Sequence, residues 1–174
     1  MQTTLYTMTI PIFIQSLEAL SAVLTKAEAY AKEKSSPKRD FSDALLNDRI
    51  VFDQYPLIRQ VQIATDNAKN SAKRLGGIEA PVFEDTEKTF AELQERIAKT
   101  ITFIKSVPKE AIEGKEDVRV SLPYWDGKSL SGFEYATQYL IPNFFFHVTT
   151  AYAIVRKNGV TIGKSDFTGP LPLV

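Results

Sequence analysis

Four stretches of the chain place apolar residues three and four positions apart, the spacing that gives a helix one apolar face. They cover residues 5–34, 43–75, 83–106 and 132–158. Within the second stretch, Pro56 predicts a kink or a break, because proline lacks the backbone donor that a helix uses. Amphipathic helices of this length bury their apolar faces against one another. The pattern therefore predicts an all-α protein, a four-helix bundle with a long connection before the fourth helix.

Residues that favour helix ends lie near these boundaries. Asp85 is a candidate N-cap of the third helix, because its carboxylate accepts from backbone amides of the first turn. Ser131 and Glu134 have the spacing of a capping box at the start of the fourth helix. Gly76-Gly77 and Asn158-Gly159 follow the second and fourth helices, where glycine readily ends a helix.

The segment between the third and fourth helices has the pattern of strands. Val118, Val120 and Leu122 alternate with polar residues, and Asp126-Gly127 is typical of a two-residue hairpin turn. We therefore expect a small β-hairpin or flap over one end of the bundle. The tail, residues 160–174, contains two glycines and two prolines and predicts an extended strap or a partly disordered segment.

Composition restricts the class of protein. At 174 residues the chain is expected to form one domain, residues 1–174. Its 21 basic and 21 acidic residues give a formal net charge of zero, which does not indicate a nucleic-acid partner. The absence of cysteine excludes disulfides and cysteine-ligated zinc. No signal-peptide pattern and no apolar run of about 20 residues is present, so we expect a cytoplasmic protein that is not bound to a membrane.

His147 is the only histidine, and it lies on or near the apolar face of the fourth helix. Histidine is the side chain whose ordinary pKa lies near neutral pH, so His147 is a candidate general acid or base, or an anchor for a ligand. The alternative is a buried histidine held by one hydrogen bond and without a chemical role. Spacing alone identifies no partner, so both interpretations stay open.

Other residues suggest a pocket beside this histidine. Gln54 and Thr65 project onto the apolar face of the second helix, where an unpaired buried amide is unfavourable by about 1–3 kcal/mol. If that helix begins only near Pro56, Gln54 lies instead in a solvated loop. Tyr124 and Trp125 precede the hairpin turn, either as an aromatic lid or as ordinary packing of the flap.

The rings of Phe144, Phe145 and Phe146 point in three directions around one helix, so at least one must face a loop, the tail or a partner subunit. Phe144 is a candidate wall of the pocket. Aromatic residues are enriched in interfaces, so the run as a whole is a candidate homodimer interface.

No phosphate-binding loop and no nucleophile elbow is present. A site with one histidine would need carboxylates or amides as further metal ligands, and the Glu-x-x-His motif of di-iron bundles is absent. We therefore expect neither a cofactor nor a bound metal, while an all-oxygen magnesium site stays open.

Four strings carry a resemblance to a known superfamily. They are PLIRQVQIA at 56–64, RLGG at 74–77, FFFHVTTAYAI at 144–154 and NGVTIGKSDF at 158–167. Over nearly its whole length the chain resembles the DinB/YfiT-like helical bundles, and more closely a branch that carries only a domain-of-unknown-function label. The resemblance implies an up-down-down-up four-helix bundle, often dimeric. In metal-binding members, one histidine from the second helix and two spaced i, i+4 on the fourth hold a divalent metal, and some members transfer low-molecular-weight thiols.

The chain departs from that metal-binding pattern. His147 matches one histidine of the fourth helix, but Asn143 and Ala151 occupy its i−4 and i+4 positions. The second helix has no histidine. Neither metal binding nor thiol transfer is therefore carried over, and the closer branch supplies no activity.

Three functions stay open. The first is a metal-free bundle with a small-molecule pocket around His147, lined by Gln54, Thr65 and aromatic residues under Trp125. It would serve as a binding protein or as an acid–base enzyme. The second is a dimeric scaffold or interaction protein without a catalytic site. The third is a divalent-metal-dependent enzyme of the DinB type with unusual oxygen ligands.

Overall fold

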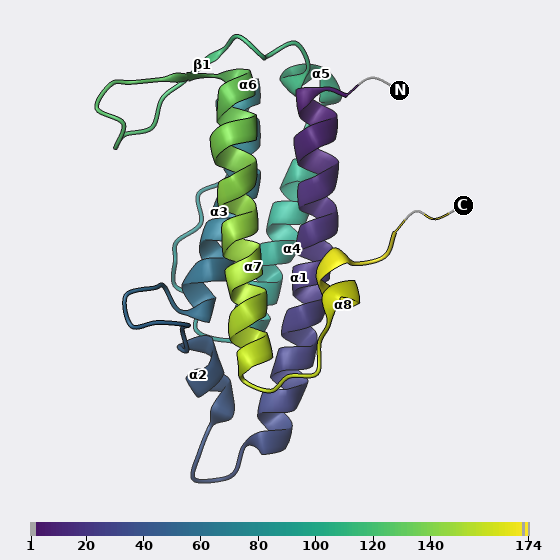
Figure 1. Ribbon diagram of the computed structural model, residues 1–174, viewed down its shortest axis with the longest axis vertical. Coiled ribbons are helices and arrows are strands. Elements are labelled where there is room, and N and C mark those ends of the chain that lie inside the picture. The colour runs from purple at the N-terminus through teal and green to yellow at the C-terminus, as the bar shows by residue number, and fades with distance from the viewer. Residues whose placement is uncertain (1–2, 172, 174) are drawn as a thin grey trace.

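The computed structural model of the chain describes residues 3–171 and 173. Four long helices lie side by side as a bundle (Figure 1). They are α1 (Leu5–Lys34), α3 (Leu57–Gly76), α4 (Phe90–Lys105) and α7 (Ile141–Lys157). In the view of Figure 1, α1 and α7 run downward whereas α3 and α4 run upward. The all-α, up-down-down-up bundle is therefore confirmed.

The connection that crosses the length of the bundle lies between α3 and α4. Because these two helices are parallel, residues 77–89, the return loop, must run back from the end of α3 to the start of α4 (Figure 1). The connection from α4 to α7 is longer in sequence but stays at one end of the bundle. Residue count alone did not show which connection spans the bundle.

Helix α1 has the predicted bounds and supplies a large part of the core. Thr4 caps it in a capping box with Thr7, and Pro11 lies within it. The helix is long and apolar enough to cross a membrane by length and composition. Its apolar stripe is buried against the rest of the bundle, which accounts for that composition.

The second predicted helix is two elements. Helix α2 (Phe41–Leu46) ends before Asn47, and α3 begins at Leu57, directly after Pro56. Pro56 therefore marks a break rather than a kink. Residues 47–56, the α2–α3 loop, project from the bundle (Figure 1).

The third predicted helix begins later than expected. Helix α4 starts at Phe90, and Thr89 rather than Asp85 is its N-cap, in a capping box with Glu92. The prediction for Asp85 was wrong because its carboxylate is attracted to arginine side chains instead of backbone amides.

The predicted flap is present, but its two paired strands are short. After α5 (Lys109–Ile112), strands β1 (Arg119–Val120) and β2 (Leu130–Ser131) pair antiparallel, with Val120 opposite Leu130. Asp126 and Gly127 form the expected turn with φ of 49° and 76°. Residues 121–129 form a loop at the side of the bundle (Figure 1), and within it the ring of Trp125 packs on Tyr135 and Tyr139. We call residues 119–131 the flap.

The fourth predicted helix contains a π-helical segment. It consists of α6 (Gly132–Glu134), the π-helix η1 (Tyr135–Leu140) and α7, and it begins with the predicted Ser131–Glu134 capping box. The ring of Pro142 would collide with the carbonyl four residues earlier in a regular α-helix. The wider π turn relieves that collision.

The tail is partly helical rather than wholly extended. Helix α8 (Lys164–Thr168) packs on α1, where Lys26 pairs with Asp166 at 2.7 Å. Part of the tail prediction falls on residues 172 and 174, which lie outside the described residues.

Candidate functional site

A row of polar side chains lies between α3 and the antiparallel helix formed by η1 and α7. On α3 these residues are seven positions apart, and on η1 and α7 they are four apart, so each set follows one helix face. We call this row the α3–α7 seam. It consists of Gln60, Asn67 and Arg74 on α3, and of Tyr135, Tyr139, Asn143 and His147 opposite them.

At one end of the seam, His147 is buried and hydrogen-bonded. Its Nδ1 lies 2.7 Å from Oε1 of Gln60, and Nε2 of Gln60 donates to the carbonyl of Tyr55 at 2.9 Å. Because an amide oxygen only accepts, Nδ1 carries the proton and Nε2 keeps its lone pair. Burial, together with the nearby charge of Arg59, lowers the pKa of His147 from 6.5 to about 4. The imidazole is therefore neutral at neutral pH.

The middle of the seam contains two asparagines. Nδ2 of Asn143 donates to Oδ1 of Asn67 at 3.1 Å and to the hydroxyl of Tyr139 at 3.4 Å. Asn67 is only 6% exposed, and its own Nδ2 is buried without a hydrogen-bond partner among the described residues. Asn143 is half-buried, so the seam reaches solvent at this point.

At the other end, the flap closes over the seam. The hydroxyls of Tyr124 and Tyr139 lie 2.5 Å apart, and the ring of Trp125 meets that of Tyr139 edge to face at 5.2 Å. Nη1 of Arg74 donates to the hydroxyl of Tyr135 at 3.1 Å. Burial raises the pKa of Tyr139, and its bond to Tyr124 raises it further. Burial also raises the pKa of Tyr135, so the phenols of Tyr135 and Tyr139 stay protonated at neutral pH.

The structure separates the residues predicted to share one pocket. His147 belongs to the α3–α7 seam, and Tyr124 and Trp125 contact Tyr139 of the seam from the flap. Phe144 does not, because its ring is fully buried in the core against Phe13 at 4.4 Å. Gln54 lies in the α2–α3 loop, as the alternative interpretation expected, although its Oε1 is buried without a partner in the described part of the chain.

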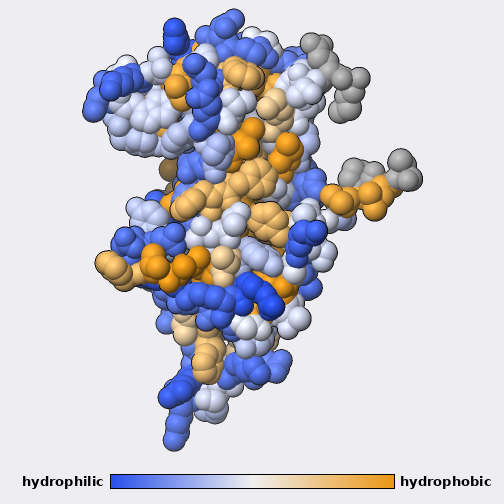
Figure 2. Space-filling view, viewed as in Figure 1, coloured by the Kyte–Doolittle hydropathy of each residue, from blue (hydrophilic) through white to orange (hydrophobic). Residues whose placement is uncertain are grey.

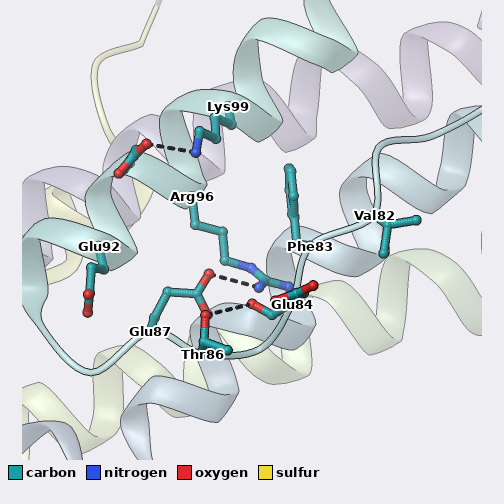
Figure 3. Close-up of a pocket in the computed structure, with 9 residues that line it drawn as sticks. Val82, Phe83, Glu84, Thr86, Glu87, Glu92, Arg96 and Lys99 are labelled. Carbon is teal, nitrogen blue, oxygen red and sulfur yellow. Dashed lines mark hydrogen bonds and ion pairs between the residues drawn. The ribbon is translucent and has the colours of Figure 1, made fainter.

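Thr65 faces α4 rather than α7, where it joins a network around Arg96. Nε of Arg96 donates to Oγ1 of Thr65 at 2.7 Å, and its Nη atoms contact Asp66 at 2.8 Å and Glu87 at 3.0 Å. The guanidinium carbon lies 5.1 Å from the ring centre of Phe83 (Figure 3). The Arg96 side chain is only 1% exposed.

This network fixes the return loop to both parallel helices. Asp85 contacts both Arg96 and Arg59, while Lys69 pairs with Asp66 at 3.0 Å. A buried arginine is tolerated only when its donors and charge are satisfied, and here three carboxylates supply both. The adjacent cleft has a volume of about 280 Å³, and Glu87 in its lining is directed at the guanidinium (Figure 3). We assign the network a structural role.

Sequence reasoning missed Gln60 and Asn67 as site residues, and it treated Asn143 only as a missing histidine. The sequence pattern that could have identified them is the regular spacing of polar residues, at positions 60, 67 and 74 on one helix and at 135, 139, 143 and 147 on the other. Those two sets meet only when the helices are antiparallel neighbours, which the pattern of apolar residues did not establish.

The donor atoms of the seam do not suit a divalent metal. They are one imidazole, three amides and two phenols, and none carries a negative charge to offset the dehydration of the ion. Gln60 and Asn143 already engage the atoms of His147 and Asn67 that face them. Within residues 3–171 and 173, no group of three or more histidine, aspartate or glutamate side chains is arranged to hold a metal ion.

Comparisons with known proteins agree with this architecture. The profile of a domain of unknown function, DUF1993, matches residues 5–168. The chain is 43% identical to a DinB family member protein from Shewanella denitrificans, whose crystal structure it matches with a TM-score of 0.90. That match covers 98% of this chain and 94% of the other. Among curated proteins no match is found. The chain therefore belongs to the DUF1993 family, a DinB-like branch of helical bundles.

Proposed function

We propose that the α3–α7 seam binds a small, uncharged molecule that presents a hydrogen-bond acceptor to Asn67. The observation that carries this proposal is the amide nitrogen of Asn67, which is buried without an acceptor in the described residues. A buried donor left unpaired is unfavourable by about 1–3 kcal/mol. A ligand acceptor that pairs with this nitrogen would recover that free energy, which makes ligand binding favourable.

The chemistry of the neighbouring groups supports an uncharged ligand. His147 is neutral, and Asn67 and Asn143 carry no charge. The charged member of the seam, Arg74, lies at the far end against the Tyr135 ring. A buried charge on the ligand would find no counter-charge beside Asn67 and would lose its hydration.

The seam is better suited to binding than to acid–base catalysis. An efficient general base has a pKa near the working pH. With a pKa of about 4, His147 is a weak base at neutral pH and has no second proton to give as an acid. Its Nε2 lone pair instead accepts a hydrogen bond from a ligand donor. The matching ligand therefore carries an acceptor for Asn67 and, about one helical turn away, a separate donor for His147, as a small molecule with amide groups can.

Aromatic side chains are placed to cover such a ligand. Trp125 and Tyr139 stand edge to face at the flap end, and Tyr124 holds Tyr139 through its hydroxyl. Figure 2 shows the surface hollowed between the flap above and the α2–α3 loop below. A planar ring bound at the seam would meet the ring of Tyr139 and the amide of Asn143, which contact each other.

The single histidine allows a direct test. Protein labelled with ¹⁵N and ¹³C in histidine gives one imidazole, so a library of small amides and lactams can be screened by the signal of His147. We compare wild type with Asn67→Ala, and with Asn70→Ala as a matched control on the same helix. Asn70 is half-buried and makes no side-chain hydrogen bond in the described residues.

The proposal predicts a compound that shifts the His147 signal in wild type and in the Asn70 variant, with at least about tenfold weaker binding to the Asn67 variant. Tenfold corresponds to about 1.4 kcal/mol, the lower part of the range for a buried hydrogen bond. Equal binding to all three proteins would contradict the role of Asn67. A library without any compound that shifts the signal would contradict the proposal.

A second candidate function, homodimeric assembly, is favoured by the outer face of α7. From Tyr135 to Val155 the chain contains no charged residue, although the outer side of this helix lies at the surface. Surface helices normally carry charge on that side. Phe146 is 54% exposed there and Phe52, in the α2–α3 loop, is 90% exposed. Figure 2 shows apolar side chains across this face.

Light scattering tests the assembly. Wild type is expected to have the mass of two chains, and Phe146→Asp to have the mass of one. Ile12→Asp is the matched control, because Ile12 is an exposed apolar residue on α1 rather than on α7. A monomeric wild type, or a Phe146 variant that stays dimeric, would contradict the assembly without affecting the ligand proposal.

A further inference from the structure

A second cleft opens at the end of the bundle opposite the flap. Its volume is about 630 Å³, within the range of small-molecule sites. It lies where α1 and α7 end and α2 begins, and Figure 1 shows these three elements together at the lower end. None of the seam residues lines it, so it is a separate site.

One side of this cleft is apolar and aromatic. Tyr30 from α1 and Phe41 from α2 line it, together with Ala44 and Leu45. Phe41 remains 38% exposed, so its ring is available to a ligand rather than buried in the core. Lys34 Nζ lies 5.4 Å from the centre of the Tyr30 ring. An alkyl chain or an aromatic ring would lose its contact with water against this wall.

The other side of the cleft is positively charged. Lys34 and Lys157 line it, at the last turns of α1 and α7. The one carboxylate in the lining, Asp48, already pairs with Lys157 at 2.8 Å and accepts from Asn158. Those two contacts hold the pKa of Asp48 below its usual range against the effect of burial. The net charge of the lining is therefore positive.

The backbone carbonyls at the C-terminal ends of α1 and α7 repel a bound anion only weakly, because hydrogen-bond donors of the protein already pair with them. The carbonyl of Ala31 accepts from both the backbone and the hydroxyl of Ser35. The carbonyl of Ile154 accepts from the Asn158 side chain. Among the described residues, the ion pair of Lys34 is a long contact of 3.4 Å with Glu33, so its ammonium can pair with a ligand.

We infer that this cleft binds an amphipathic monoanion, an aryl or alkyl carboxylate or sulfonate whose acid group meets Lys34 and Lys157 and whose apolar part lies on Tyr30 and Phe41. Charge complementarity selects the anion, and the aromatic wall selects an apolar body over inorganic anions. The contacts at the charged rim are solvent-exposed, so binding is expected to weaken as salt is added.

The probe is 8-anilinonaphthalene-1-sulfonate, followed by its fluorescence, with decanoate as competitor. Ala44 is exposed and lines the cleft, so opposite charges can be placed at one tolerant position. Ala44→Glu is expected to weaken probe binding about two- to fivefold, and Ala44→Lys to strengthen it by a similar factor. Lys34→Gln is expected to weaken it, whereas Lys32→Gln, in the same helical turn but outside the lining, is the matched control.

Three results together would establish the site: one probe bound per chain, displacement by decanoate, and opposite effects of the two Ala44 variants. An unchanged His147 signal on probe binding would show that the α3–α7 seam is not the site. Equal affinities of both Ala44 variants, or equal losses for Lys34→Gln and Lys32→Gln, would overturn the inference. Failure of the seam proposal would leave this result unaffected, since the two sites share no residue.

Discussion

The neutral, buried state of His147 makes the stability of the protein depend on pH in a defined way. In the unfolded chain the imidazole has its ordinary pKa of 6.5, whereas in the fold the pKa is about 4. The unfolded state therefore binds more protons between these two values, and stability falls as pH decreases through that window. Each pKa unit corresponds to about 1.36 kcal/mol, so lowering the pH from 7 to 5 is expected to remove about 2 kcal/mol.

The variant His147→Asn isolates this contribution. Its amide nitrogen can replace Nδ1 as the donor to Gln60 but does not titrate. Urea unfolding of both proteins at pH 7, 6 and 5 gives two curves of free energy against pH. Carboxylates titrate alike in both proteins, so the difference between the curves belongs to His147.

We expect the wild type to lose about 2 kcal/mol relative to the variant between pH 7 and pH 5. The imidazole signal of the folded wild type should titrate with a midpoint near 4. Two results would refute the burial and neutrality of His147. One is a difference in unfolding free energy between the two proteins that stays constant from pH 7 to pH 5, and the other is an imidazole titration with a midpoint between 6 and 7. Either result would also remove the argument for an uncharged ligand.

Other variants test the fold around the seam. Arg96→Met leaves three carboxylates without their shared cation and is expected to lower the free energy of unfolding by about 3–5 kcal/mol, whereas exposed Lys99→Met should change it by less than about 0.5 kcal/mol in the same urea assay. Phe144→Ala removes a fully buried ring and is expected to destabilise by about 3–5 kcal/mol, measured in the same way; a loss below about 1 kcal/mol would contradict its place in the core. Gly132→Ala would put a Cβ 2.0 Å from a backbone oxygen at the base of the flap, so the fluorescence of Trp125, the only tryptophan, should shift to longer wavelength as the flap moves. An unchanged Trp125 spectrum would show that the flap does not depend on that close approach.

The helices with one clear apolar stripe were predictable from the sequence. In residues 5–34, apolar side chains recur every three or four positions without interruption, and a polar segment follows. Helix α1 has the same bounds in the structure. The start of α3 was ambiguous, because residues 43–55 extend the same period through Pro56 although they form a short helix and a loop. Periodicity describes a face and does not show whether the backbone between two segments is continuous.

The start of α4 was not predictable for a different reason. Asp85 and its neighbouring acids suit a helix N-terminus, but a buried Arg96 attracts them more strongly. In sequence Arg96 looks like any solvent-facing arginine of an amphipathic helix. Its burial depends on the parallel packing of α3 and α4, which is a property of the topology.

The candidate site was predicted in part. His147 and the flap aromatics were identified because a lone histidine and a Tyr-Trp pair are conspicuous. Asn67 and Gln60 were not identified, because polar residues are common on helices. Whether such a residue belongs to a site depends on which side chains the facing helix places opposite it. The π-helical segment before Pro142, which aligns Tyr135 and Tyr139 with α3, has no reliable sequence pattern.

Two facing helices hold the unpaired amide donor of Asn67 and the neutral imidazole of His147 in one row of polar side chains, and we propose that this row binds a small uncharged molecule. The most direct measurement is the electron density next to Nδ2 of Asn67 in a high-resolution crystal structure of protein purified without added ligand or soaked with a compound found by the His147 screen. We expect density larger than a water molecule, with an acceptor atom about 2.9 Å from that nitrogen. A dry seam, or one isolated water in both crystals, would contradict it.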